Sequence, residues 1–291
     1  MKDSESIGMF AERALTYVAA EWETRGAPAE LAVDVLAIAG VSAILGDSPA
    51  AYEFAEKVIA AIPTPRYIDA PLFAALAAAA TALKVSDSEY AAEYIGLLAE
   101  HADAGASDAN TALLRLALHG AALRAYPRVR LDLSPALLRN GRSEDLLSVV
   151  KTIEAASAYG TIPLAVPEPL CAIIQGAALS KFRAYDLSVG MRVARAARYL
   201  TDDSSAEILA CNAFIRSSQE RDGGFGDYHM AFQSLKRSGQ GHAIWTIRSA
   251  ITLDALWTIA ELTSADFRMA RALFGNFGLA RRTETSGKVT C

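Results

Sequence analysis

A nearly unbroken succession of alanine-rich helical patterns constrains the fold of this chain more than any other feature. Residues 5–24 and 50–62 carry apolar side chains on one face, whereas residues 29–45 and 71–83 are apolar nearly all round. Period-two alternation of β-branched residues, which is typical of strands, is almost absent. The alternation of amphipathic and fully apolar helices predicts an all-α protein in which outer helices cover inner ones.

The same rhythm continues to the C-terminal part and suggests helix pairs. Further helices are predicted at residues 143–158, 168–182, 187–200, 205–219, 228–236, 242–262 and 265–274. A pair recurs about every 40 to 50 residues, which lies in the range of helical repeat proteins. We expect a closed (α/α)6 toroid of about six pairs; the alternative is an open helical-repeat solenoid. One domain should span residues 1–280, followed by a flexible tail at 281–291.

Composition excludes several classes of protein. Hydrophobic residues make up 52% of the 291, and the net charge of -5 shows no basic face for nucleic acid. The opening residues are polar and the apolar runs are shorter than the roughly 20 residues of a membrane span. Three cysteines without metal-type spacing, Cys171, Cys211 and Cys291, are typical of a reducing compartment. We therefore expect a cytoplasmic protein without a membrane span or a nucleic-acid partner. No stripe of residues indicates an oligomeric state.

The segment "SSQERDGGFG", residues 217–226, interrupts the helical pattern late in the chain. Gly223 and Gly224 can adopt positive φ just past a helix end and close that end with a left-handed cap. Phe225 can fill the gap between two neighbouring helices. The Gln219 side chain can bond backbone groups at an adjacent helix end. These residues therefore favour a structural role for the segment.

This segment resembles the recurring motif of the terpenoid cyclase and protein prenyltransferase toroid family. The matching positions are Gln219, Asp222, Gly223, Gly224, Phe225 and Gly226, and the stretch 241–262 resembles the inner helix that follows. The resemblance covers residues 217–262; elsewhere the chain matches in helix-pair rhythm. It implies a clasp between helices, a toroid, and an isoprenoid ligand inside an apolar central cavity.

The acid and metal motifs of that family are missing from the sequence. Neither Asp-x-Asp-Asp nor Asp-Asp-x-x-Asp occurs, and Asp202 and Asp203 stand where a helix N-cap belongs. His242 falls near the position of the family's zinc-binding histidine, but the Asp-x-Cys partner is absent. We expect neither a metal nor a cofactor.

Five residues are the candidate site of acid/base chemistry or anion contact. Arg248 and His242 lie on the helix expected to form a cavity wall, together with Trp245, Ser249 and Leu253 on one side. Tyr228, His229 and Asp222 belong to the glycine segment or follow it directly. Structural alternatives are a salt bridge of Arg248 to Asp254 or to an acid on another helix, a capping or core role for His242, and a surface helix that begins after Asp227. The aromatic residues expected to line a cavity, or else to be ordinary core, are Trp245, Trp257, Phe73 and Phe182.

Three functions are compatible with these features. The first is an isoprenoid-handling enzyme, cyclase-like or prenyltransferase-like, whose aromatic walls stabilise carbocations. The second is a non-catalytic toroid that binds an apolar ligand or a protein partner. The third is a carbohydrate-active α/α barrel, which requires two carboxylates facing one cavity.

Overall fold

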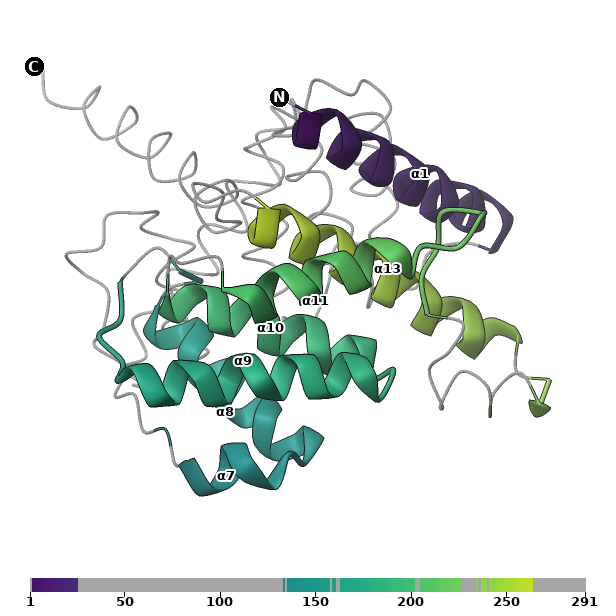
Figure 1. The fold of residues 1–291 in the computed structure, drawn as a ribbon. Coiled ribbons are helices and arrows are strands. Elements are labelled where there is room, and N and C mark those ends of the chain that lie inside the picture. Colours follow the sequence, from purple (N-terminus) through teal and green to yellow (C-terminus); the bar gives the residue numbers. More distant parts are fainter. Residues whose placement is uncertain are drawn as a thin grey trace, which may run out of the picture.

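The computed structural model is helical throughout the part of the chain that it describes (Figure 1). That part comprises residues 2–25, 133, 135–157, 159–160, 163–201, 205–226, 234, 237–239 and 241–263. Its helices are α1 (Lys2–Arg25), α7 (Pro135–Asn140), α8 (Ser143–Ala156), α9 (Glu168–Arg183), α10 (Leu187–Leu200), α11 (Ala206–Ser217) and α13 (Gly241–Thr263). No strand occurs within these residues, which confirms the all-α class. The proposed tail at 281–291 lies outside them.

Most helix boundaries follow the sequence punctuation. The predicted helix at 187–200 coincides with α10, and α8 ends two residues before the predicted position 158. The predicted N-cap of α11 was wrong. Ser205 has extended backbone, and its Oγ accepts a hydrogen bond from the Ile208 amide at 3.3 Å. A serine directly before the first turn reaches that amide, whereas Asp202 and Asp203, outside the described residues, precede the cap position.

Helix α10 is the centre of the described part, since it packs against α8, α9, α11 and α13. All its residues except Ser188 and Arg192 are buried. Small side chains allow close approach: a Cβ on Gly190 would lie 3.2 Å from the ring of Phe182 on α9. The short connection at 184–186 makes α9 and α10 an antiparallel pair. This burial gives α10 the position of an inner helix.

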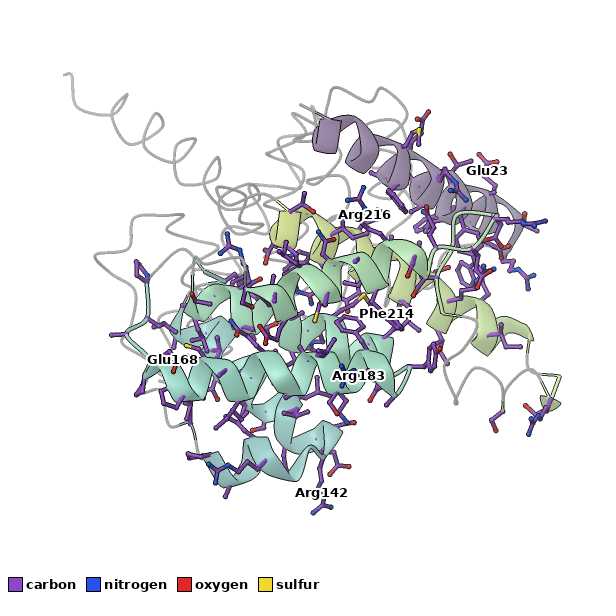
Figure 2. All side chains as sticks on the ribbon, in the orientation of Figure 1. Glu23, Arg142, Glu168, Arg183, Phe214 and Arg216 are labelled. Carbon is purple, nitrogen blue, oxygen red and sulfur yellow. The ribbon has the colours of Figure 1, made fainter. Side chains whose placement is uncertain are left out.

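Helix α1 brings the start of the chain against its late part. It packs on α13, and its buried face includes Ala14, Tyr17 and Val18, as the amphipathic pattern predicted. Figure 1 shows the loop that follows α11 folding beside α1. Arg216, labelled in Figure 2, stacks over the ring of Phe10 with its guanidinium carbon 5.1 Å from the ring centroid.

None of the helices within the described residues combines the length and the apolar character that crossing a bilayer requires.

Candidate functional site

The glycine segment forms a clasp between α1 and α13, which we define as residues 218–226. The Gln219 side-chain amide donates to the Phe10 carbonyl at 3.1 Å and to the Gly223 carbonyl at 3.0 Å. Arg13 on α1 donates to the backbone carbonyls of Glu220 and Arg221. The contacts to α1 each join residues about two hundred positions apart in the chain. The predicted hydrogen bond from the Gln219 side chain to the backbone of a neighbouring helix is therefore confirmed. Its acceptor lies in the interior of α1, whereas a helix end was predicted.

Each glycine of the clasp meets a different constraint. Gly223 has φ +96°, and a Cβ there would collide with the Arg13 carbonyl oxygen. Gly224 does not have the predicted positive φ. It lacks a side chain for another reason: a Cβ at this position would lie only 3.0 Å from the guanidinium of Arg248. Gly226 has φ +108° and lies against Ile251 of α13. The predicted left-handed cap directly after α11 was wrong, because Ser218 takes the C-cap in right-handed conformation.

Phe225 is packed into the core. Its side chain is 1% exposed, and its amide donates to Thr252 Oγ1 at 3.0 Å. The same hydroxyl donates to the Arg248 carbonyl at 2.8 Å. A buried aromatic ring and a satisfied amide therefore attach the clasp to α13.

Two of the five sequence-predicted site residues meet in the clasp. Both terminal nitrogens of Arg248 donate hydrogen bonds to the Asp222 carboxylate, at 2.7 and 2.8 Å. The Arg248 guanidinium also lies 4.6 Å from the centroid of the Tyr17 ring. Partial burial alone would raise the pKa of Asp222, but hydrogen bonds from Arg248 and the Gly224 amide lower it overall. Burial raises the pKa of Tyr17 to about 12. The salt-bridge partner of Arg248 is therefore Asp222, and the suggested pairing with Asp254 was wrong.

The other three predicted residues are not brought into this arrangement by described contacts. His242 is the second residue of α13, about 9 Å along the helix from Arg248, and its side chain lies outside the described ones. Tyr228 and His229 lie outside the described residues, as does Phe73.

A cavity of about 560 Å³ opens between α8, α10 and α13. From α10 it is lined by Ser188, Arg192 and Arg195, and from α8 and its following turn by Glu154 and Tyr159. From α13 it is lined by Ile247, Ala250, Ile251, Asp254 and Trp257. Its volume falls within the usual range of small-molecule sites.

Helix α13 lines this cavity, but with another face than the one predicted from the sequence. The predicted face holds Trp245, Ser249 and Leu253, all of which are buried in the core. Successive residues turn by about 100° around a helix, so the adjoining positions 247, 250, 251 and 254 form the observed face. Phe182 is ordinary core at 0% exposure, whereas Trp257 lines the cavity as predicted.

Arg195 is tightly held within the wall. It is 2% exposed, and its Nη1 lies 2.5 Å from Asp254 Oδ1 and 2.6 Å from Thr258 Oγ1. Its guanidinium carbon stacks 4.5 Å from the Trp257 ring centroid. Burial alone would lower the pKa of Arg195, but nearby negative charge, first that of Asp254, raises it overall. Arg195 and Asp254 therefore form a fixed ion pair.

Arg192 and Glu154 are less firmly paired. Arg192 Nη2 lies 3.8 Å from Glu154 Oε2, beyond hydrogen-bond distance. The Arg192 side chain is 32% exposed, whereas that of Glu154 is 7% exposed. Burial raises the pKa of Glu154 against the lowering effect of Arg192 and Arg195. The cavity thus presents a reachable cation beside a buried carboxyl that holds its proton more readily than usual.

Aromatic side chains complete the wall. The turn after α8 gives Tyr159 φ 51°, with its amide bonded to the Glu154 carbonyl. Its ring lies 5.9 Å from that of Trp257 and 6.4 Å from that of Tyr199. Trp257 donates to Glu261, a fully buried carboxylate, at 2.8 Å. Burial raises the pKa of Tyr199 well above its ordinary value.

Sequence reasoning missed the charged members of this cavity, Glu154, Arg192 and Arg195. A signal was present: α10 carries arginine at positions 192, 195 and 198 of a helix that is otherwise apolar or small. Arginines at that spacing share one helical face, and a helix packed on several sides must give them partners. Among the described residues, no group of three or more His, Cys, Asp or Glu is arranged to hold a metal ion.

No protein-family model, no curated protein and no solved structure matches this chain.

Proposed function

We propose that the α8–α10–α13 cavity binds a small molecule that has both an anionic group and an apolar body. The observation that supports this is the division of the cavity wall. Arg192 supplies a reachable positive charge, while Ile247, Ile251 and Trp257 supply apolar surface. A cation and an apolar wall in one cavity of about 560 Å³ suit a ligand with both characters.

The isoprenoid-handling enzyme expected from the sequence is the form of this proposal that we favour. An isoprenoid diphosphate has the required chemistry: its oxyanions would pair with Arg192 and its hydrocarbon chain would lie over Tyr159 and Trp257. In prenyl transfer, the carbon–oxygen bond to diphosphate breaks, a bond to the acceptor forms, and the acceptor loses a proton to a base. In the cyclase form, Glu154 supplies the acid that protonates the alkene, a role that its raised pKa suits; in prenyl transfer the released diphosphate takes the acceptor's proton. The resemblance of residues 217–226 to the family motif supports this choice.

The proposal includes a closed toroid of six helix pairs over residues 1–280 and a cytoplasmic location. The antiparallel α9–α10 pair and the buried inner position of α10 support the toroid. A compact chain of 291 residues should have a radius of gyration of about 19 Å in small-angle scattering. A markedly larger value would favour the open solenoid.

Ligand-induced thermal stabilisation tests the binding proposal. Non-hydrolysable thio-analogues of farnesyl and geranylgeranyl diphosphate, at about 100 times their dissociation constant, should stabilise the protein by about 2.7 kcal/mol. For a chain of this size, this corresponds to a rise of roughly 4 °C in melting temperature. Farnesol, which lacks the anion, should give a smaller shift. Arg192→Gln should reduce the shift, whereas Arg183→Gln on the exposed surface of α9 should not (Figure 2).

Two results would count against the isoprenoid proposal. The first is that neither analogue shifts the melting curve, and the second is that R192Q responds as strongly as the wild type. Binding without turnover of the natural diphosphates would instead favour the second function, a non-catalytic protein that carries the same ligand.

A carbohydrate-active α/α barrel is a second candidate, because Glu154 and Asp254 both line the cavity. Burial raises the pKa of Glu154, as a general acid requires, while Asp254 stays paired with Arg195. Stabilisation by uronic acids or oligosaccharides, with no response to the isoprenoid analogues, would favour this function.

A further inference from the structure

Arg192 differs from its neighbour on α10 in how much of its charge is engaged. Arg195 is buried and bonded to Asp254 and Thr258. Arg192 is one-third exposed, and its recorded contact is the 3.8 Å approach to Glu154. An oxyanion that enters the cavity therefore meets a guanidinium that can form two charge-assisted hydrogen bonds without breaking any.

We propose that Arg192 binds the oxyanion of the cavity ligand and that Glu154 takes up a proton from solvent when it does so. This inference rests on the proposed function in locating the ligand in the same cavity. It adds the residue that holds the anion and a coupling between binding and the acid that would act on the ligand.

The charges around Glu154 are balanced so that engaging Arg192 shifts its protonation. Four charged side chains act on its carboxyl: Arg192 and Arg195 on α10, and Asp254 and Glu261 on α13. A bound anion engages Arg192 and adds negative charge beside Glu154. Arg195 is already neutralised by Asp254, since their atoms lie 2.5 Å apart. The ionised carboxyl is then left among negative charges in a buried position, so its protonated form becomes more favourable.

The chemical consequence is that the acid form of Glu154 becomes more populated when substrate is bound. The protonated Glu154 carboxyl can donate its proton to the ligand and becomes a carboxylate. When the anionic product leaves, Arg192 again faces that carboxylate, and the free enzyme returns to its starting charge. The proton balance closes with one proton taken from solvent for each one given to the ligand.

Calorimetric titration with sulfate tests the coupling without any need to know the natural ligand. Sulfate stays a dianion throughout the working range of pH, so it exchanges no proton of its own. Titrations in buffers of different ionisation enthalpy measure the protons taken up. We expect proton uptake to be greatest at a pH between the pKa of Glu154 in the free protein and its pKa in the complex. At that pH the uptake should approach about one proton per sulfate bound. Over the same interval, affinity should fall by up to about tenfold per pH unit.

Matched variants separate the two residues. Glu154→Gln should bind sulfate with no proton uptake and no pH dependence. Arg192→Gln should weaken binding by about tenfold or more. Glu144→Gln, an exposed glutamate on the same helix, and R183Q should both behave as the wild type. Melting temperatures and circular dichroism spectra show that each variant is folded.

Three outcomes would overturn the inference: no sulfate binding, binding without proton uptake at every pH, or uptake that persists in E154Q. They are distinguishable from failure of the isoprenoid proposal. Sulfate binding with uptake, in a protein that ignores the isoprenoid analogues, would leave this inference standing and change only the ligand. Stabilisation by the analogues with no uptake would overturn this inference alone.

Discussion

Replacing Gly223 by alanine should destabilise the protein strongly, because this position is constrained in two ways. Its φ of +96° is unfavourable for any residue with a side chain, at a cost of about 1–3 kcal/mol. The new Cβ would also collide with the Arg13 carbonyl oxygen on α1. Relief of that collision moves the clasp away from α1 and weakens the hydrogen bonds of Arg13 and Gln219, which contribute about 1 kcal/mol each.

The sum is about 3–5 kcal/mol, which should lower the melting temperature by roughly 5 to 8 °C for a chain of this size. Thermal melts followed by circular dichroism and urea unfolding curves measure it. Gly176→Ala is the matched control, because this exposed glycine in α9 has nothing within 4 Å of an added Cβ. Alanine there should be neutral or stabilise by about 0.5–1 kcal/mol. If G223A melted with the wild type, the contact between the clasp and α1 would be wrong.

Three further substitutions test the electrostatics. Asp222→Asn should cost about 1 kcal/mol at neutral pH, because Asp222 is half exposed in its pair with Arg248. Since the folded pKa of Asp222 is lowered, this difference should shrink as pH falls through that pKa. Glu154→Gln should stabilise the protein above the ordinary pKa of glutamate, increasingly as pH rises through the raised folded pKa. Trp257→Phe removes a donor to the buried Glu261 and should cost about 1–3 kcal/mol.

Urea unfolding across a range of pH measures all three substitutions. A loss in D222N that is as large in acid as at neutral pH would show that the carboxylate charge is not involved. Equal stability of E154Q and wild type at alkaline pH would mean that Glu154 is better solvated than its burial indicates. Wild-type stability of W257F would mean that the indole bond to Glu261 contributes nothing.

Local features were predictable because they depend on neighbouring residues. The apolar period placed α10 at the correct residues, and the glycines with their flanking Gln219 and Phe225 indicated a clasp. The N-cap of α11 was missed because Asp202, Asp203 and Ser205 are all good capping residues, and only the course of the backbone selects Ser205. Positive φ was expected at Gly224 and found at Gly226. Any glycine of the segment can adopt positive φ, and packing determines which of them does.

Charge pairing was the least predictable part of the site. Asp254 is six residues from Arg248 on α13, yet it bonds to Arg195 of α10, while Arg248 turns to Asp222 in the clasp. A sequence states which charges are present and which helical face each one occupies. It does not state which faces meet.

The sequence by itself determined that this chain makes helices, where most of the described ones begin and end, and that residues 218–226 interrupt them, because propensity, capping and apolar period act over a few positions. Only the tertiary structure decided that Arg192 lies beside Glu154 in the wall of a cavity and that Arg13 reaches the clasp. Those contacts join residues tens to hundreds of positions apart, and their geometry exists only once the helices have packed.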